Sequence, residues 1–404
     1  MLQRAIIFFT VILSFELYAY TAFSTVFAGS SILPLIYFSG TAIIILSIAL
    51  YFNFNLREKL NIPRQLLMAI FFLLFIPKLF TVILLVPEDL IRLIKAGINV
   101  IGKMQLYLGR SEIWSLITLI IAGSLTAAFI YGALFNVYNY KIRKVAIKLV
   151  KLPKSFNGLK VVQISDIHSG SLSDKKAIQK AVDKINNLNP DLIFFTGDLV
   201  NNIAVEAVEF VDIFSQLKAV HGVYSILGNH DYGDYMYWPD PDDKIKNLEH
   251  LKSLHQKMGW RLLLNENIHI EKENDKIIVA GVENWSARGR FHSYGKLEKT
   301  LNGIQDAFTV LLLSHDPSHW EAEILNHPAK VDITFSGHTH GMQFGIEFLK
   351  FKWSPVKYIY KQWAGLYSKK DQHLYVNRGF GVIGYPGRVG ILPEITLFTL
   401  YTTT

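Results

Sequence analysis

The sequence predicts two parts of different fold class: an all-α transmembrane bundle of four helices, followed by a soluble domain in which strands and helices alternate. Three observations lead to this division. Residues 1–136 contain 14 charged residues, whereas the remaining 268 residues contain 60. All 13 His residues lie after residue 167. Short apolar segments that end in polar residues begin after residue 155, and such segments are typical of buried strands.

The composition excludes several classes of protein. Half of the residues are hydrophobic and only 18% are charged, whereas a soluble chain is about 25% charged. A wholly soluble protein and a disordered one are therefore excluded. The absence of Cys excludes a disulfide scaffold and fits a reducing compartment. The net charge of +8 divides equally between residues 1–136 and the rest, so we expect no nucleic-acid partner. Excess Lys and Arg instead indicate cytoplasmic loops and an anionic lipid surface.

Four apolar runs are long enough to cross a bilayer, which takes ~20 residues each: residues 5–28, 32–54, 66–87 and 114–136. A signal peptide is the alternative for the first run, but its apolar core is too long. Glu16 and Lys78 lie inside the first and third runs. Either they form an intramembrane functional pair, or each faces the bundle or snorkels to the interface. Residues 88–101 have helical apolar spacing and are expected to lie flat on the interface.

The basic residues beside these runs predict the orientation of the chain. With the N-terminus inside, the outer loops carry Arg92, Lys95, Lys103 and Arg110, and the inner segments carry Arg4, Arg57, Lys59, Arg64, Lys141, Arg143, Lys144 and Lys148. This balance places both ends in the cytoplasm. We expect an integral protein of a bacterial inner membrane, with a membrane domain at residues 1–136, a basic connector at 137–155 and a soluble domain at 156–404.

In the soluble domain, five apolar segments each run into a cluster of Asp, Asn or His. They are LKVVQIS before Asp166 and His168, DLIFFT before Asp198, GVYSIL before Asn229, His230 and Asp231, TVLLLS before His315 and Asp316, and VDITFS before His338 and His340. Helix-like stretches at residues 173–187 and 205–217 separate the first strands, and Ser173 and Asp174 are expected to cap the first helix. Open α/β sheets carry their sites at the carboxyl ends of strands, so these clusters are expected to meet.

The residue types in these clusters predict a metal site. Asp, Asn and His bind Mn, Fe, Zn or Mg. Asp166 and His168 are two residues apart, so both can face one side of an extended loop, and His338 and His340 repeat this spacing. Seven such side chains at five strand ends are more than one metal needs as ligands. We therefore expect two divalent cations that share one carboxylate, that of Asp198. Two cations about 3.5–4 Å apart hold a phosphate, activate water and stabilise the leaving oxygen. Each motif alone more often has a structural role. Five motifs in this order, each after an apolar strand, indicate a functional site instead.

The motifs DIH, GD, GNHD, SHD and GHTH, in this order within residues 158–402, resemble the calcineurin-like metallophosphoesterase superfamily. The run HLYVNRGFGVIGYPGRVGILPEITLFTL also resembles membrane-associated bacterial phosphoesterases similar to UDP-2,3-diacylglucosamine hydrolases. The resemblance implies an α+β/α/β fold, the four-layer αββα sandwich. It implies that one metal binds Asp166, His168, Asp198 and His340, and that the other binds Asp198, Asn229, His315 and His338.

By the same resemblance, His230 matches the His that protonates the leaving group, and Asp231 is expected to orient it. Met342 departs from the pattern of this branch, which carries a second Gly there, so the shape of that loop is in question. Arg378 and Arg388 either clamp the second phosphate of a diphosphate substrate or form structural salt bridges.

Three other features have competing interpretations. The aromatic residues after GNHD form either a substrate lid or a packed surface loop: Tyr232, Tyr235, Tyr237 and Trp238. Asp240, Asp242 and Asp243 are expected to begin a helix rather than bind a metal. Residues 344–367 interleave Lys with aromatic residues, and we expect them to touch the membrane beside the active site. The alternative is an amphipathic strand pair packed on the sheet of the fold.

The sequence therefore predicts a membrane-tethered two-metal phosphoesterase that faces the cytoplasm. A hydroxide attacks phosphorus in line, and His230 donates a proton to the leaving oxygen. The expected partners are membrane lipids and a phosphorylated small molecule or lipid; the oligomeric state is left open. One alternative is a phosphoesterase of soluble nucleotides or phosphoproteins that uses the membrane half as an anchor. Another is a membrane sensor or transporter with a regulatory phosphoesterase-like domain, but its site should have lost ligands.

Overall fold

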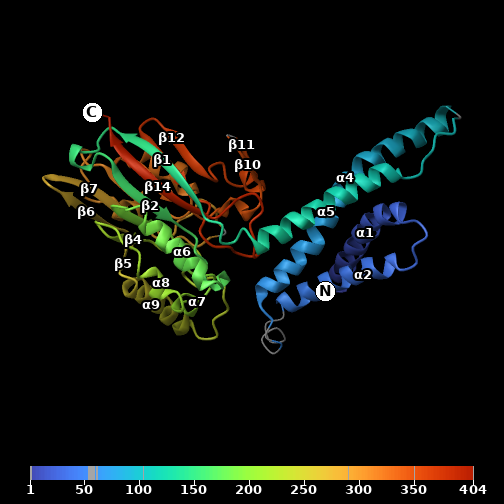
Figure 1. The fold of residues 1–404 in the computed structure, drawn as a ribbon, viewed down its shortest axis with the longest axis horizontal. Coiled ribbons are helices and arrows are strands. Elements are labelled where there is room, and N and C mark those ends of the chain that lie inside the picture. The colour runs from blue at the N-terminus through green and yellow to red at the C-terminus, as the bar shows by residue number, and fades with distance from the viewer. Residues whose placement is uncertain are drawn as a thin grey trace. The chain divides into compact units, whose positions relative to one another are not determined.

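The computed structural model describes residues 2–52, 60, 62–102, 104–289, 291–349 and 351–403 (Figure 1). Three basic residues named in the sequence analysis lie outside these ranges: Arg57, Lys59 and Lys103. Lys350, in the predicted membrane-contacting segment 344–367, also lies outside them. The chain divides into two compact units. Unit 1 consists of Met1–Ala133 and Gly384–Pro386, and unit 2 consists of Leu134–Ile383 and Gly387–Thr404.

Unit 1 is helical, and its described helices cover the four predicted apolar runs: α1 Leu2–Val26, α2 Leu33–Phe52, α4 Arg64–Gly102 and α5 Glu112–Leu134. Within the described residues, α2, α4 and α5 are long and apolar enough to cross a membrane. Four crossings therefore stay a prediction. Residues 88–101 are not a separate interfacial helix, because they continue α4 beyond Pro87. With 39 residues at about 1.5 Å each, α4 is longer than the ~30 Å hydrocarbon core.

The two charged residues inside the predicted spans meet in unit 1. Lys78 Nζ lies 2.7 Å from Glu16 Oε2, and both side chains are buried. Thr41 Oγ1 donates to the same Glu16 oxygen at 2.7 Å and accepts from Lys78 Nζ at 2.9 Å. The Lys78 ammonium also lies 4.3 Å from the centre of the Tyr37 ring. Both side chains therefore face the helix bundle and pair with each other instead of snorkelling.

Unit 2 contains two six-stranded sheets. The first has the order β1-β14-β2-β3-β4-β5 and the second the order β12-β13-β9-β8-β7-β6. The first sheet consists of β1 Lys141–Leu149, β2 Leu159–Ile164, β3 Leu192–Phe195, β4 Val223–Ser225, β5 Trp260–Leu262 and β14 Glu394–Thr402. The second consists of β6 Glu266–Lys272, β7 Asp275–Gly281, β8 Val310–Leu313, β9 Ile333–Ser336, β12 Gly365–Lys369 and β13 Gln372–Val376.

The five strands expected from the motifs are β2, β3, β4, β8 and β9. Strands β2, β3 and β4 run parallel, and so do β8 and β9. Parallel strands end at the same edge of a sheet, so the residues that follow them collect there. The alternation of strands and helices predicted this arrangement correctly.

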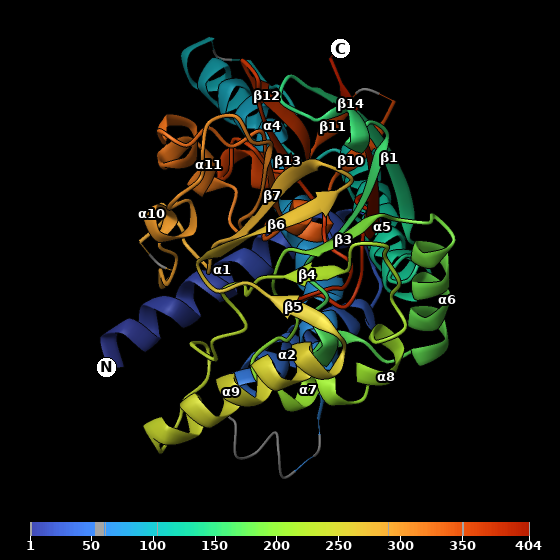
Figure 2. The same cartoon turned by 90° about the vertical axis from the view of Figure 1, so that its left-hand side faces the viewer.

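Four apolar clusters lie in the described part of unit 2, and three of them involve the two six-stranded sheets. One contains Phe194 from β3 and Phe335 from β9, whose ring centroids are 5.1 Å apart, so the inner faces of the two sheets pack together. A second joins the first sheet to helices α6 Lys175–Asn186 and α9 Pro241–Lys257. A third joins the second sheet to α10 Leu297–Thr300 and α11 Ser318–Ala322. Figure 2 shows α9 beside β5.

The helix starts follow the predicted capping chemistry. The Asp174 carboxylate accepts the Ala177 N–H at 3.0 Å and caps α6. Asp240 caps α9 in the same way by accepting the Asp242 N–H at 2.9 Å, so this acidic group begins a helix as expected. Residues 205–217 form two short turns, α7 Val205–Val208 and α8 Val211–Phe214, instead of one helix.

Two segments contain strands that the sequence analysis did not place as the structure does. The basic connector contains β1, which pairs in parallel with β14 from Lys141↔Glu394 to Leu149↔Thr402. Buried and exposed side chains alternate at the end of this strand, where Ile147 and Leu149 are buried and Lys148 is exposed. The many Lys residues of the segment made this alternation difficult to recognise in the sequence. The aromatic segment after GHTH contains the strand pair β10 Ile346–Phe348 and β11 Phe351–Trp353. This pair is a two-stranded sheet of its own rather than part of a larger sheet.

Candidate metal centre

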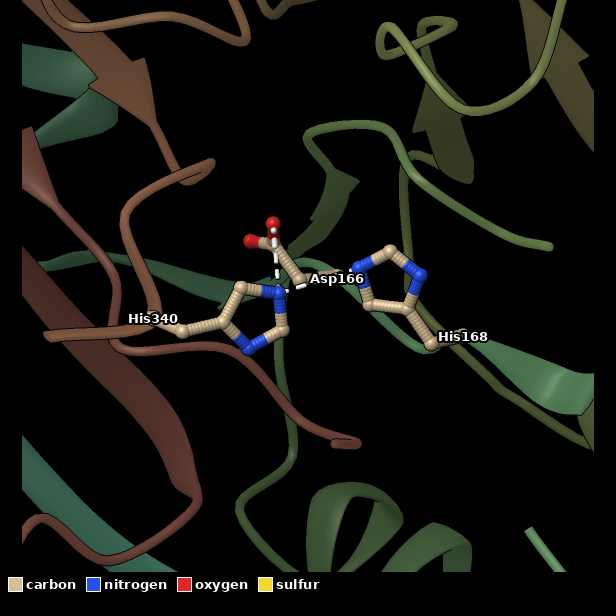
Figure 3. A group of neighbouring side chains, drawn as sticks. All are labelled: Asp166, His168 and His340. Atoms are coloured by element: carbon tan, nitrogen blue, oxygen red, sulfur yellow. Dashed lines mark hydrogen bonds and ion pairs between the residues drawn. The ribbon is translucent and has the colours of Figure 1, made fainter. Parts of the chain in front are cut away.

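The first candidate group consists of Asp166, His168 and His340 (Figure 3). Asp166 and His168 follow β2, and His340 follows β9. The Nε2 atoms of His168 and His340 are 3.0 Å apart, and His340 Nε2 lies 3.3 Å from Asp166 Oδ1. All three side chains are buried. The two predicted His-containing motifs therefore meet, although 172 residues separate His168 from His340.

The second candidate group consists of Asp198, His315 and His338. His315 Nε2 lies 3.2 Å from Asp198 Oδ2 and 3.3 Å from His338 Nδ1. Asn229 Oδ1 lies 2.7 Å from the same His338 nitrogen. The Asn229 amide nitrogen donates to the hydroxyl of Tyr235 at 2.8 Å, which turns the carbonyl oxygen of Asn229 toward His338.

Asp198 lies between the two groups. Its Oδ2 atom is 3.2 Å from His315 Nε2 in one group and 3.6 Å from His168 Nε2 in the other. Its Oδ1 atom accepts the backbone N–H of His230 at 2.9 Å. One carboxylate oxygen is thus held by the backbone while the other adjoins both sets of donors. This is the position that a shared carboxylate requires.

The donor set fits divalent cations. His168 Nδ1 lies 3.2 Å from the carbonyl oxygen of Val200, and His315 Nδ1 lies 2.7 Å from that of Thr196. A carbonyl only accepts hydrogen bonds, so each Nδ1 carries a proton and Nε2 is the ring nitrogen that faces the site. Lone pairs and carboxylate oxygens at these separations repel one another unless positive charge lies among them. Oxygen and imidazole donors together suit Mn, Fe, Zn or Mg.

The electrostatics of the buried groups agree with this fit. Burial raises the pKa of Asp198, but the positive charges of His315 and His230 hold the pKa of this carboxyl well below its ordinary value. Burial lowers the pKa of His168 well below its usual range. Burial also lowers the pKa of His315, but the Asp198 carboxylate outweighs it and raises that pKa to about 10. The site therefore keeps its carboxylate ionised and favours positive charge beside it.

The backbone under the donors is strained in a way that is common at functional sites. Positive φ occurs at Asp166 (53°), His168 (47°), Asp198 (61°), His338 (71°) and His340 (50°). Few residues other than Gly adopt this conformation, and each one costs roughly 1–3 kcal/mol. The neighbouring Gly337 is required for space, because a Cβ there would lie 1.9 Å from Ser165 Oγ. The positions of the donor side chains therefore require backbone conformations that lower the stability of the fold.

Met342, which departs from the pattern of the resembling branch, keeps the conformation that a Gly would take. Its φ is 56°, close to that of the preceding Gly341 at 54°. The loop shape therefore survives the substitution, with a strained residue in place of Gly. The Met342 side chain lines a cavity at the metal centre.

His230 lies at the site, but its partner differs from the prediction. His230 Nδ1 is 2.7 Å from the backbone oxygen of Asn201. The Asp231 carboxylate instead accepts the backbone N–H groups of Asp198, Leu199, Val200 and Gly228 at 2.8–3.2 Å. The Asn201 carbonyl, and not Asp231, therefore orients the His230 ring. Asp231 holds the loop that carries Asp198, because its buried carboxylate faces the backbone behind that residue.

Arg378 and Arg388 do not have the predicted substrate role. Arg378 is buried and pairs with Glu394 and Glu347, each at 2.6 Å. Arg388 is fully buried and donates to the carbonyls of Arg378, Gly379 and Gly381. Its Nη2 atom lies 3.4 Å from His340 Nδ1. Both guanidinium groups are thus engaged inside the fold, which corrects the expectation that they clamp a phosphate.

The aromatic residues after GNHD divide between the two interpretations. Tyr232 is buried, stacks on Tyr294 at 3.8 Å and donates to Glu283 at 3.0 Å. Tyr235 adjoins the site, with its ring centroid 4.6 Å from that of His230. Tyr237 is exposed. The start of this loop is therefore packed structure, and Tyr235 supports the site directly.

The sequence analysis missed the support of His338. Tyr360 Oη lies 2.8 Å from His338 Nε2 and donates to Asp316 Oδ2 at 3.2 Å. Asp316 Oδ2 is itself 3.5 Å from His338 Nε2. Asp316 belongs to the SHD motif, but no sequence pattern distinguishes Tyr360 from the other aromatic residues around it.

A cavity of about 220 Å³ opens at the metal centre. One part of its lining consists of donors: His168, Asp198, Asn229, His230, His338 and His340. The other part is apolar: Phe291, Met342, Val356, Ile359 and Ile383. The lining of the cavity therefore combines polar side chains suited to an anionic group with apolar side chains.

A parallel-stranded α/β core with two adjoining donor groups at its strand ends defines a protein of the binuclear metallohydrolase class. The family model described as "Calcineurin-like phosphoesterase" matches residues 159–342. The model described as "Probable Calcineurin-like phosphoesterase, transmembrane domain" matches residues 3–137. The chain is 31% identical over 290 residues to the "Uncharacterized metallophosphoesterase YkuE" of Bacillus subtilis, with 70% of this chain and 93% of that protein covered. The chain belongs to the calcineurin-like phosphoesterase family, and its N-terminal part matches the transmembrane domain found with such phosphoesterases.

Two further relatives extend the comparison. The "Transmembrane protein with metallophosphoesterase domain" of Danio rerio is 32% identical over 278 residues, which cover 67% of this chain and 60% of that protein. The chain thus spans less than two thirds of the length of that relative. The "UDP-2,3-diacylglucosamine pyrophosphatase LpxG" of Chlamydia trachomatis is 28% identical over 274 residues, with 57% of this chain and 81% of that protein covered.

Proposed function

We propose that this protein hydrolyses a phosphodiester, diphosphate or phosphomonoester bond in an amphiphilic substrate, a lipid or a lipid-linked phosphate. The cavity carries the proposal, because its donor-lined part lies next to an apolar wall. Such a wall can contact the hydrocarbon of a lipid or the base of a nucleotide. The transmembrane domain in the same chain favours the lipid. The relative named as a UDP-2,3-diacylglucosamine pyrophosphatase supports the same substrate class.

The proposed roles of the residues follow from their positions. One metal would be held by Asp166, His168, Asp198 and His340, and the other by Asp198, Asn229, His315 and His338. When bound, the two metals neutralise the phosphate and activate water for attack on phosphorus.

His230 is the proposed general acid. Its Nδ1 atom faces the Asn201 carbonyl, so Nε2 is the atom that donates a proton to the leaving oxygen. The ring lines the cavity beside the donors, which is where a leaving group would lie. Asp231 has a supporting role in this scheme, because it fixes the backbone that carries Asp198.

The comparison of two chromogenic esters tests the reaction class. Purified full-length protein should release p-nitrophenol from p-nitrophenyl phosphate or from its bis ester after Mn²⁺ is added, and the faster substrate identifies a monoesterase or a diesterase. A chain with Asp198→Asn serves as the control for contaminating phosphatases. Failure of the wild-type protein on both esters, with each of the four candidate metals, would refute the proposed activity.

A lipid extract tests the substrate class. Membrane lipids profiled by mass spectrometry before and after incubation with the enzyme should lose a phosphate-containing species and gain its hydrolysis product. Equal profiles, together with rapid turnover of nucleotides or phosphopeptides, would favour a soluble substrate and reduce the membrane half to an anchor.

The finer architecture is also proposed. The apolar clusters on both outer sheet faces and between the sheets support the four-layer αββα sandwich. The Lys and Arg bias beside the apolar runs supports four spans in a bacterial inner membrane with the catalytic domain in the cytoplasm. A green fluorescent protein fused after Thr404 should fluoresce, and an alkaline phosphatase fused there should be inactive. An active alkaline phosphatase fusion would reverse this orientation.

A further inference from the structure

The hairpin of β10 and β11 exposes an apolar face. Its register pairs Ile346 with Trp353 and Phe348 with Phe351. Side chains two apart in a strand share a face, so these four residues lie on one side of the hairpin. Ile346 is 55% exposed, Phe348 70% and Phe351 61%, and Leu349 at the turn is 92% exposed. A hairpin that faced only water would place polar residues there.

The opposite face of the hairpin is charged, and its side chains contact the rest of unit 2. Glu347 and Lys352 form the remaining pair of the register. Glu347 accepts from Arg143 and from Arg378, the latter at 2.6 Å. Lys352 Nζ donates to the Ala364 carbonyl and lies 5.5 Å from the centre of the Trp363 ring. The ion pairs fix the charged face toward the protein, so the outward position of the apolar face is specified rather than accidental.

The hairpin is continuous in sequence with the apolar wall of the cavity. Met342 precedes β10, and Val356 and Ile359 follow β11, and all three line the cavity. The base of the hairpin is fixed, because Ser354 Oγ donates to the Gly341 carbonyl at 2.8 Å. Lys357 and Tyr358 beside it are exposed, a combination suited to the headgroup level of an anionic leaflet.

We propose that the β10–β11 hairpin inserts its apolar face into the lipid bilayer and guides a lipid headgroup along the Met342, Val356 and Ile359 wall to the metal centre. A bilayer is the favoured occupant because the same chain carries helices long enough to span one. Only six residues separate the end of α5 at Leu134 from the start of β1 at Lys141, and six residues extend over at most about 22 Å. The guiding role rests on the proposed function, whereas the insertion of the hairpin does not.

The depth of the hairpin can be measured without any activity. The chain has no Cys, so F348C provides a single attachment site for a nitroxide spin label in the full-length protein. V220C is the matched control, because Val220 is 76% exposed and lies elsewhere in unit 2. Both are reconstituted in vesicles of phosphatidylethanolamine and phosphatidylglycerol. Collisions with oxygen, which concentrates in lipid, are then compared with collisions with a water-soluble nickel chelate.

We expect the label at position 348 to favour oxygen over nickel, and the label at position 220 to show the reverse. Equal nickel accessibility at the two positions would place the hairpin in water and overturn the proposal. Protection of position 348 from both reagents would indicate a protein contact, such as a second copy of this chain, and would also overturn it. A circular dichroism spectrum equal to that of the wild-type protein confirms that the labelled chain is folded.

The guiding role is tested with two diesters that share a leaving group. Hexadecyl p-nitrophenyl phosphate is embedded in the vesicles, and methyl p-nitrophenyl phosphate is dissolved in water. The double variant F348D/F351D should lose at least about tenfold in turnover of the embedded ester, because charged side chains oppose insertion, and keep its turnover of the soluble one. V220D should change neither. Equal losses on both esters would overturn the guiding role, whereas a wild-type chain that is inactive on both diesters and on p-nitrophenyl phosphate would instead refute the proposed function.

Discussion

The two units bury charged side chains in opposite ways. In unit 1, opposite charges pair: Glu16 with Lys78 at 2.7 Å, and Glu88 with Arg110 at 2.8 Å. In unit 2, groups of one kind converge at the strand ends. His168 and His340 approach to 3.0 Å, and His315 and His338 to 3.3 Å.

This difference separates structural charges from functional ones. A buried charge is tolerated when a partner of opposite sign lies beside it, and such a pair needs nothing from outside the chain. Converging imidazoles and carboxylates are tolerated only with positive charge among them, which is either a proton, as the raised pKa of His315 indicates, or a metal cation that replaces it. Arg378 of unit 2 follows the pattern of unit 1, since Glu394 and Glu347 flank it. The presence of an oppositely charged partner within the chain therefore distinguishes Arg378 from the candidate metal ligands that lie near it.

The largest effect is expected when the shared carboxylate is neutralised. Asp198→Asn removes the negative charge next to both donor groups, so it should abolish the binding of at least one metal and nearly all turnover. Circular dichroism should show an unchanged fold, because the amide oxygen can still accept the His230 N–H. Elemental analysis of the purified protein measures the metal content.

Asp191→Asn is the matched control for this variant. Asp191 precedes β3 while Asp198 follows it, and its carboxylate accepts only the Lys160 N–H at 2.7 Å among the contacts described. It should keep both metals and full turnover. Two metals per chain in the Asp198→Asn protein would show that convergence of donors is a poor guide to function.

The second effect concerns the proton donor. His230→Ala should slow substrates with alkyl leaving groups by about 10²–10⁴-fold, the usual contribution of general acid catalysis. An aryl ester leaves without a proton, so p-nitrophenyl phosphate should be much less affected. The ratio of the two rates at saturating substrate is the measurement. His250→Ala, at an exposed His of α9, should leave the ratio unchanged. Equal losses on both esters would assign His230 a structural or metal-binding role.

The third effect concerns the buried ion pair of unit 1. Lys78→Met leaves Glu16 buried without its partner, which should cost about 3–5 kcal/mol of stability, whereas Glu16→Gln with Lys78→Met should cost much less. Thermal unfolding in detergent ranks the variants. Hydrolysis of p-nitrophenyl phosphate should persist in both. If stability were unchanged but activity in vesicles disappeared, the pair would be functional and the distinction drawn above would fail.

Much of the fold and of the donor set could be predicted because the signals are local. Each predicted strand is an apolar run that ends beside a donor, as β3 ends before Asp198, and parallel strands bring such ends together. The brief period-two pattern of β1 was obscured by its Lys residues. The merging of residues 88–101 into α4 was missed because Pro87 suggested a helix boundary that the structure does not have.

The supporting contacts of the site could not be predicted. The His230 ring is held by the backbone carbonyl of Asn201, and its position depends on the path of the loop there. Every residue has such a carbonyl, so the sequence does not indicate which one makes the contact. The roles of Arg378 and Arg388 depend on partners far away in sequence, such as Glu347 and the carbonyl of Gly379. Composition indicates that such residues are present, but only the fold decides what each one faces.

The smallest effect concerns Tyr360. This residue is not a candidate metal ligand, but it hydrogen-bonds one, His338. Its hydroxyl lies 2.8 Å from His338 Nε2 and donates to Asp316, so it fixes the ring whose Nδ1 atom faces the site. Residues of this kind typically change metal affinity by 10–100-fold. Tyr360→Phe removes only the hydroxyl, and we expect about a tenfold weaker affinity for the second metal with little change in turnover at saturating metal.

Metal titration of chelator-stripped protein, followed by hydrolysis of p-nitrophenyl phosphate, measures this affinity. Tyr358→Phe is the control, because Tyr358 lies two residues away and is 74% exposed, and its titration curve should match that of the wild type. A shift confined to Tyr360→Phe would show that the donors in unit 2 depend on neutral hydrogen-bonding support, unlike the self-sufficient ion pairs of unit 1. Identical curves for both variants would mean that Asp316 alone holds His338, and that the aromatic segment contributes nothing to the metal centre.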